Sequence, residues 1–191
     1  MHQLVHEVRA KGLAILLLDI ANAFDTVDRD LMISLASKGC PELVNLTWWL
    51  YKLESRLVTN EGHVIRSSTG TQQGCCLSNP VFALGMKYIE GLLNDIDCLR
   101  RPLFYWDDTA IVGTPEALEA AVAIINECTQ VTGLRLKWKK CHLHGSPETI
   151  QQCSTRAFPP AMTMKAHFNM AYLKAPIGDD RFFSKWLDNS T

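Results

Sequence analysis

The stretch Phe104-Tyr105-Trp106-Asp107-Asp108 is followed at once by Thr109-Ala110-Ile111-Val112-Gly113. Apolar residues run up to two adjacent aspartates and resume immediately after them, which predicts a β-hairpin with the aspartates at its turn. Two unneutralised carboxylates about 4 Å apart repel each other by about 4 kcal/mol at an effective dielectric constant of about 20, so we expect a cation beside them. Mg²⁺ is the natural candidate, because it binds carboxylate oxygens together with substrate phosphates. An Asp-Asp pair is also common in solvated turns, so the rest of the chain has to decide between the two.

The composition is that of a globular protein. The chain has 191 residues, 47% of them hydrophobic, which suffices for one domain with a sizeable core. The longest apolar run, at residues 13–18, is far shorter than the ~20 residues that a membrane span needs, and no cleavable leader precedes it. We therefore expect neither secretion nor a membrane partner.

The cysteines are scattered and odd in number, seven in all. Without C-x-x-C spacing they indicate reduced thiols, which are typical of an intracellular protein of the nucleus or cytoplasm. A zinc site is conceivable on Cys141, His142, His144 and Cys153, but their spacing fits no closed tetrahedral pattern and we do not expect one.

The charges are unevenly spread. A net charge of −1 is low for a protein that binds nucleic acid, because such proteins usually carry a basic excess. Basic residues nevertheless gather in two short stretches: Arg100 and Arg101, and then Arg135, Lys137, Lys139 and Lys140. Both a phosphate-facing patch and an ordinary solvated surface remain open.

A buried strand is predicted upstream of the hairpin, at residues 13–18, because a short continuous apolar run suits a strand covered on both faces. It ends in Asp19. A carboxylate at the end of a central strand is costly to bury unpaired, so we expect Asp19 at a surface or bound to a cation.

The remaining segments alternate between helical and extended patterns. Capping residues and apolar periodicity predict helices at residues 2–11, 28–38, 81–95 and 115–133, from residue 146 and at the C-terminus. Gly39 would stop the helix at 28–38. A further helix would begin at Pro41 and carry leucines at positions 43, 46, 50 and 53. Extended segments are expected at residues 56–68, a hairpin turning at 60–62, and at 134–138, 141–144 and 170–177, with 158–165 irregular. This order favours an α+β fold with a split β-α-β-β-α-β sheet, in which Asp19 can meet the Asp107-Asp108 pair.

Five motifs, in their order along the chain, resemble those of reverse transcriptases, most closely of non-LTR (LINE-type) retrotransposons. Residues 17–27, Leu-Leu-Asp-Ile-Ala-Asn-Ala-Phe-Asp-Thr-Val, look like motif A, and residues 72–78, Gln-Gln-Gly-Cys-Cys-Leu-Ser, look like motif B. Residues 105–108 are similar to the Y-x-D-D box. Residues 132–136 with Lys140 resemble motif D, and residues 172–178 resemble the YLG-type segment that follows it. Lys137 stands where the family usually has asparagine.

The resemblance implies a polymerase palm with a ferredoxin-like sheet, helices on one face and part of the fingers. Residues 1–191 would be a reverse transcriptase palm fragment, with 41–72 a partial fingers insertion between motifs A and B. The N-terminal fingers and the thumb of the full-length protein would be absent. The implied partners are an RNA template, a DNA primer and deoxynucleoside triphosphates.

The implied chemistry is nucleotidyl transfer by an RNA-directed DNA polymerase with two Mg²⁺ ions, for which Mn²⁺ can substitute. By the resemblance, Asp19 and Asp107 bridge or ligate the metals with the carbonyl of Ile20, and Asp108 completes the metal-binding cluster in a less direct role. Lys140 is the cation near the leaving pyrophosphate. These aspartates and Lys140 are the predicted catalytic residues.

The resemblance also implies a substrate-binding set of Phe24, Gln73, Gly74 and Tyr105. Phe24 would be the steric gate, because a ring beneath the sugar leaves no room for the 2′-hydroxyl that distinguishes RNA from DNA. Gln73 and Gly74 would contact the nascent base pair and the template. A lone phenylalanine is more often a core aromatic residue, and the fixed offset of Phe24 from Asp19 is what favours the gate. Gln73 and Gly74 are also compatible with an ordinary turn.

Two alternatives share this fold. The chain could be a degenerate or domesticated relative that binds nucleic acid or a partner without catalysis. The complete set of three aspartates argues against this. An RNA-synthesising polymerase would share the palm and its metals, and Phe24 argues against that activity.

Overall fold

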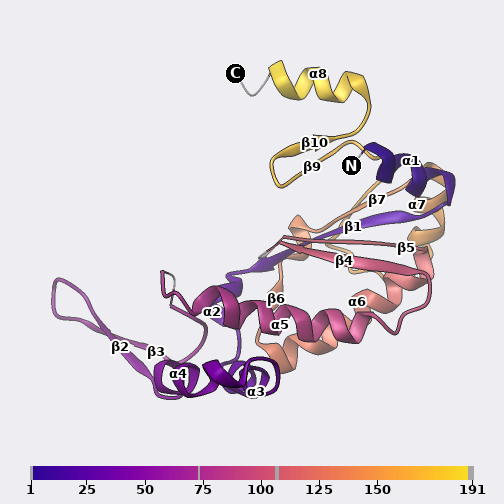
Figure 1. Cartoon of the computed structure of the whole chain (residues 1–191). Helices are drawn as coiled ribbons and strands as arrows, with labels where there is room; N and C mark the ends of the chain where they lie inside the picture. The colour runs from indigo at the N-terminus through magenta and orange to yellow at the C-terminus, as the bar shows by residue number, and fades with distance from the viewer. Residues whose placement is uncertain (1, 73, 106–107, 189–191) are drawn as a thin grey trace. The chain divides into compact units, whose positions relative to one another are not determined.

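The chain forms two compact units in a computed structural model that describes residues 2–72, 74–105 and 108–188 (Figure 1). The first, which we call the sheet unit, comprises Met1–Asp19, Asn94–Ala123 and Leu136–Thr191. The second, the helical unit, comprises Ile20–Leu93 and Ile124–Arg135.

A mixed β-sheet organises the sheet unit, with strand order β4-β5-β1-β7-β8 and with β6 also paired to β1. Its strands are β1 (Ala14–Ala21), β4 (Leu99–Tyr105), β5 (Asp108–Gly113), β6 (Arg135–Leu136), β7 (His142–His144) and β8 (Thr163–Lys165). The pairs β4/β5, β5/β1 and β1/β7 are antiparallel, and β7/β8 is parallel. This arrangement, in which antiparallel pairs dominate, confirms the predicted α+β class.

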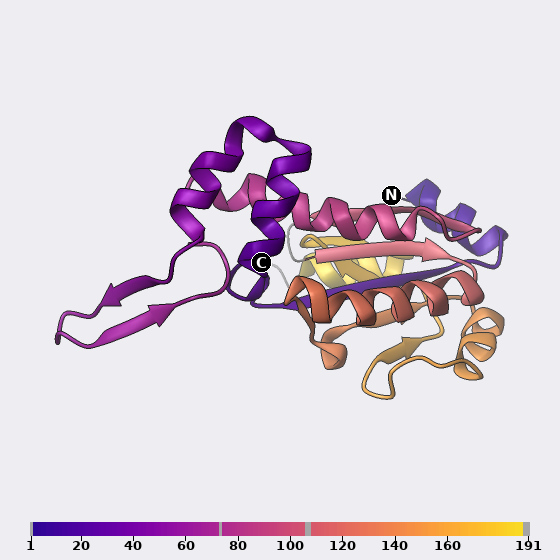
Figure 2. The same cartoon turned by 90° about the horizontal axis from the view of Figure 1, so that it is seen from below.

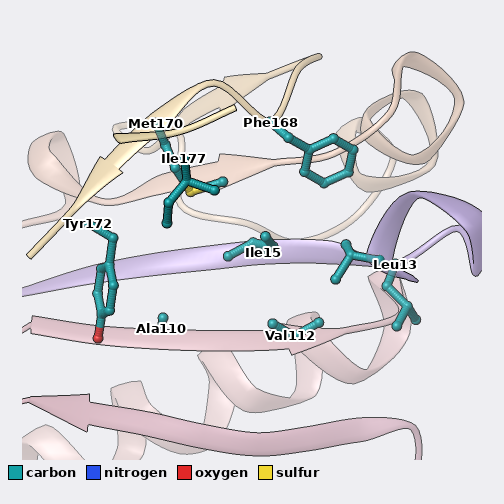
Figure 3. Packing of buried hydrophobic residues seen from close by; sticks show 9 residues of the cluster. Leu13, Ile15, Ala110, Val112, Phe168, Met170, Tyr172 and Ile177 are labelled. Carbon is teal, nitrogen blue, oxygen red and sulfur yellow. The ribbon is translucent and has the colours of Figure 1, made fainter. Parts of the chain in front are cut away.

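Strand β1 is covered on both faces, as its continuous apolar run predicted. One face packs against α1 (His2–Ala10) and the hairpin of β9 (Met170–Tyr172) and β10 (Ala175–Ile177) (Figures 1 and 3). The core on this face consists of Val8, Leu13, Ile15, Ala110, Val112, Phe168, Met170, Tyr172 and Ile177. Residues 115–123 of α6 (Pro115–Thr132) run along the other face, where Leu118, Ala121 and Val122 are buried.

Three further elements complete the sheet unit: the 3₁₀-helix η1 (Trp138–Lys140), α7 (Pro147–Ser154) and α8 (Asp180–Asp188). Helix α7 begins where the sequence predicted, because the Ser146 hydroxyl accepts a hydrogen bond of 3.2 Å from the Thr149 amide. Helix α6 begins in the same way, with the Thr114 hydroxyl 3.3 Å from the Ala117 amide.

The helical unit contains α2 (Ala23–Thr26), α3 (Arg29–Gly39), α4 (Pro41–Tyr51), α5 (Ser78–Leu93) and the hairpin of β2 (Ser55–Val58) and β3 (Val64–Ser67). Asp28 caps α3, since its carboxylate accepts a 2.7 Å hydrogen bond from the Leu31 amide. Figure 2 shows the β2–β3 hairpin projecting away from α3 and α4. Of the four leucines expected at helical spacing from Pro41, Leu46 and Leu53 are exposed, and the buried side chains of α4 are Thr47 and Tyr51.

Several local predictions were wrong. Gly39 does not stop α3 but is its last residue, and the chain leaves the helix at Cys40, which has φ −151°. Residues 163–165 are not irregular but form β8. Residues 170–177 are not one strand, because Leu173 and Lys174, with φ of 50° and 59°, turn the chain into a hairpin. The strand expected at 134–138 covers only residues 135–136.

Candidate active site

Asp19 and Asp108 are brought together by the pairing of β1 with β5. They are direct partners in the antiparallel register, in which Leu17 pairs with Ala110 two residues earlier. Side chains of directly opposed residues lie on the same face of a sheet with Cβ atoms about 5 Å apart. The two carboxylates therefore share one face of the sheet at its end.

Asp108 is the first residue of β5 and pairs with Tyr105 of β4, so it lies in the strand and not in the turn as predicted. Its side chain is exposed. Asp107, Gln73 and the side chain of Tyr105 lie outside the described residues.

The carboxylate of Asp19 is incompletely satisfied. Its Oδ1 atom is buried and accepts no hydrogen bond from any described residue. This oxygen forms an ion pair with the ammonium of Lys137, whose Nζ lies 3.7 Å from it. This distance is short enough for an ion pair but too long for a direct hydrogen bond. A buried, unbonded carboxylate oxygen is costly, so the position favours a further cation.

The backbone around Asp19 is held by two residues that follow α6. The Lys137 amide donates a 2.9 Å hydrogen bond to the Asp19 carbonyl. The Asp19 amide donates to Cys141 Sγ at 3.5 Å, and that thiol in turn donates to the Lys137 carbonyl at 3.5 Å. Burial raises the pKa of Cys141, which keeps the thiol protonated for this role. The end of β1 is thereby tied to β6 and η1.

Tyr172 lies beside Asp108 on the same face. Burial, and then the negative charge of Asp108, raise the pKa of the Tyr172 phenol. The phenol donates a 3.5 Å hydrogen bond to the Leu103 carbonyl of β4, and Figure 3 shows the Tyr172 ring extending from β9 toward β5. The YLG-type segment is therefore part of the surroundings of the carboxylates.

The donor set fits a hard divalent ion. Two carboxylates on one face, one with an orphaned oxygen, offer the ligands that Mg²⁺ prefers. Among the described residues, which leave out Asp107, no group of three or more histidine, cysteine or acidic side chains could hold a metal.

Among the described residues, the side chains of the conceivable zinc site do not gather into a group that could hold a metal. All seven cysteines are free thiols, and Cys141 is engaged with the Asp19 backbone. His144 Nδ1 instead lies 3.1 Å from the His167 carbonyl, and the His142 and His144 rings meet edge to face at 6.2 Å.

Two further predicted residues are Ile20, whose carbonyl was expected at the metal, and Lys140, expected near the leaving pyrophosphate. Ile20 follows Asp19 in β1 and its side chain is buried. Lys140 is an exposed residue at the end of η1, where its amide donates a 2.7 Å hydrogen bond to the Lys137 carbonyl.

Phe24 belongs to the helical unit, at the start of α2. Its ring packs on that of Phe82 with centroids 4.5 Å apart and planes tilted by 31°. Its carbonyl accepts a 2.6 Å hydrogen bond from the Thr71 amide. Gly74, the other described substrate residue of this unit, is exposed and has φ +87°.

Gly70 allows the loop before α5 to lie directly on α2. A Cβ at Gly70 would meet the Asp25 carbonyl carbon at 2.3 Å and the Phe24 oxygen at 2.4 Å, and its φ of +69° disfavours other residues. The Gly70 amide donates a 2.9 Å hydrogen bond to the Val27 carbonyl. The loop just before motif B is thus held to motif A by its backbone.

The backbone of motif D also lies directly against residues 26–28, at the end of motif A. A Cβ at Gly133 would lie 2.4 Å from the Thr26 oxygen, and the Asp28 amide donates a 2.8 Å hydrogen bond to the Thr132 carbonyl. Both glycines are therefore required by close backbone approach.

The contacts of two residues were not foreseen from the sequence. Arg29 is a buried guanidinium that donates to the Gly70 and Ser67 carbonyls, each at 2.8 Å, and lies over the Tyr51 ring at 5.6 Å. Nothing local in the sequence marked it. Lys137 was counted in the basic stretch, and its departure from the family's asparagine was the one signal that it has a special place.

The family of the chain follows from comparison with known proteins. The family model described as "Reverse transcriptase (RNA-dependent DNA polymerase)" matches residues 2–156. The chain belongs to this family.

Similar proteins agree with this assignment. The chain is 31% identical over 147 residues to the "Retrovirus-related Pol polyprotein from type-1 retrotransposable element R2" of Nasonia vitripennis, a match that covers 71% of this chain and 14% of the polyprotein. It thus supports a reverse transcriptase domain of the non-LTR type.

Solved structures support the fold. Apo telomerase from Candida tropicalis superposes with a TM-score of 0.63 at 12% identity, over 93% of this chain and 34% of the telomerase. Telomerase from Candida albicans, in complex with the TWJ fragment of telomeric RNA, gives 0.56 at 10% identity, over 73% and 29%. The chain thus spans about a third of these telomerases.

None of the described helices is long and apolar enough to cross a membrane.

Proposed function

We propose that this chain is the catalytic palm, with residues 41–72 as part of the fingers, of an RNA-directed DNA polymerase. The substrates would be an RNA template, a DNA primer and deoxynucleoside triphosphates. The observation that carries the proposal is the direct opposition of Asp19 and Asp108 across β1 and β5. Like charges placed directly opposite each other destabilise a sheet. A cation that both carboxylates bind explains why they are kept there.

Asp19, Asp107 and Asp108, with the carbonyl of Ile20, would hold two Mg²⁺ or Mn²⁺ ions. When bound, these ions supply activation of the primer hydroxyl and neutralisation of the triphosphate. The buried Oδ1 of Asp19 supports this assignment, because it accepts no hydrogen bond from a described residue. The aspartates hold the reacting groups in place, which is most of what a protein contributes to phosphoryl transfer.

The helical unit would bind the nucleotide and the template. The Phe24 ring excludes a ribose 2′-hydroxyl, and its packing on Phe82 gives it the fixed position that a steric gate needs. Gln73 and Gly74 contact the nascent base pair, and Tyr105 contacts substrate beside the aspartates. Lys140, exposed on η1, neutralises charge on the leaving pyrophosphate.

The test is primer extension on an RNA template by the full-length protein, with Mg²⁺ and each class of nucleotide. Asp19→Asn should reduce extension by at least about a thousandfold, because the carboxylate acts on the reacting groups. Asp30→Asn is the matched control, because Asp30 is an exposed carboxylate that pairs with Lys52 at 2.9 Å. Equal activity of the two variants would overturn the proposal. A wild-type protein that binds template and primer but extends nothing would instead support a non-catalytic, domesticated relative.

A further inference from the structure

Lys137 places a positive charge at the carboxylate that the proposed function assigns to the metal. Its Nζ lies 3.7 Å from Asp19 Oδ1, and the two side chains are 39% and 31% exposed. The same oxygen is buried and accepts no hydrogen bond from a described residue. The ammonium therefore lies beside the carboxylate oxygen of Asp19 that accepts no hydrogen bond and could bind a metal.

The backbone keeps Lys137 in this place. Its amide donates to the Asp19 carbonyl at 2.9 Å, and its carbonyl accepts from the Cys141 thiol at 3.5 Å. Cys141 is fully buried, so this second anchor belongs to the core. Because both polar groups of the Lys137 backbone are held, its side chain begins at the edge of the site and Asp19 stays within its reach.

A divalent ion on Asp19 and Asp108 has to share the carboxylate with this ammonium or displace it. Without the ion, the ammonium offsets the repulsion between the two carboxylates. With the ion bound, the ammonium becomes a like charge close to it. Even at the dielectric constant of water, a unit charge about 5 Å from a divalent ion weakens its binding about tenfold.

We propose that Lys137 is an internal counter-cation of Asp19 that competes with the divalent metal and sets the metal concentration at which the site fills. The inference rests on the proposed function, since it takes the Asp19 and Asp108 pair as a metal site. Lys137 is in this sense a positioning residue, which acts on the metal through Asp19.

The test measures metal affinity directly. Full-length protein is stripped of metal, and Mn²⁺ and Mg²⁺ are titrated by calorimetry, with the unfolding temperature recorded at each metal concentration. Lys137→Asn should bind Mn²⁺ about tenfold more tightly than the wild type. Lys137→Arg keeps the charge and should bind as the wild type does. Lys139→Asn is the matched control, because it removes the same charge from an exposed residue of η1.

The outcomes separate the two proposals. If Asp19→Asn and Asp108→Asn abolish metal binding but Lys137→Asn binds no better than Lys139→Asn, the role of Lys137 is overturned and the metal site stands. If neither the wild type nor Lys137→Asn binds metal, both proposals fail. If Lys137→Asn binds metal more tightly than the wild type, the role of Lys137 as a counter-cation is supported. If the wild type then extends no primer, the polymerase activity is refuted.

Discussion

Asp19 faces Asp108 directly across the antiparallel ladder between β1 and β5. The two residues come from strands that are remote in sequence, and each lies at the end of a largely buried apolar run. The fold thus places two negative charges together where its core stops. Such an arrangement is unfavourable without a cation, which gives it a measurable effect on stability.

Asp108→Asn should stabilise the metal-free protein by about 0.5 kcal/mol, because it removes one of two like charges that face each other. The same change should abolish the rise in unfolding temperature that we expect Mn²⁺ to produce in the wild type. Thermal unfolding with a chelator and with Mn²⁺ measures both effects. A variant that is still stabilised by Mn²⁺ would show that the metal binds elsewhere.

Gly70→Ala should destabilise the protein by about 3 kcal/mol or more, since it combines a strained backbone with overpacking against α2. Gly74→Ala is the matched control. Its φ of +87° is equally unfavourable, but a Cβ there would meet nothing within 4 Å, so its cost should be about 1 kcal/mol. Denaturant unfolding of the two variants gives the comparison. Equal midpoints would contradict the close contact between motif A and the loop before motif B.

Phe24→Val should let the polymerase incorporate ribonucleotides, because the smaller side chain leaves space for the 2′-hydroxyl. It should also cost about 1–3 kcal/mol of stability, because the contact with Phe82 is lost. Phe24→Tyr keeps that contact and should keep the preference for deoxynucleotides. Primer extension with each nucleotide class measures this preference. An unchanged preference for deoxynucleotides in Phe24→Val would show that Phe24 is not the steric gate.

His144 should make the protein less stable in mild acid. Burial lowers its pKa from 6.5 to about 4, so between these values the unfolded chain binds more protons than the folded one. The free energy of unfolding therefore falls by about 3 kcal/mol in total as the pH decreases from 6.5 to 4. Above pH 6.5 the imidazole is neutral in both states, so the full stability is present there.

Chemical denaturation of the wild type from pH 7 to pH 4 measures this slope. His144→Gln should remove most of it. Part should remain, because burial and then the charge of Lys165 also lower the pKa of His142. An identical slope in His144→Gln would show that other groups govern the acid sensitivity.

The details of the C-terminal region could not be predicted, for a physical reason. Leu173 and Lys174 turn the β9–β10 hairpin with positive φ, although neither residue type favours that conformation. The turn is held by packing of Met170, Tyr172 and Ile177 against the sheet. Strand β8 likewise exists because β7 is there to pair with it. In both cases distant contacts override the local signal.

The sequence by itself determined most helices, the central hairpin, the reverse transcriptase motifs and the pairing of an early aspartate with a later one. The helices and the hairpin follow from apolar periodicity, caps and turn residues, which act over a few positions. The motifs rest on the family resemblance, and the aspartate pairing was expected from the order of the predicted elements. Only the tertiary structure decided that Arg29 clamps the loop at Ser67 and Gly70, and that Lys137 lies beside Asp19. A lysine looks the same in a sequence whether it faces solvent or a carboxylate, because its partner is chosen by strand pairing far along the chain.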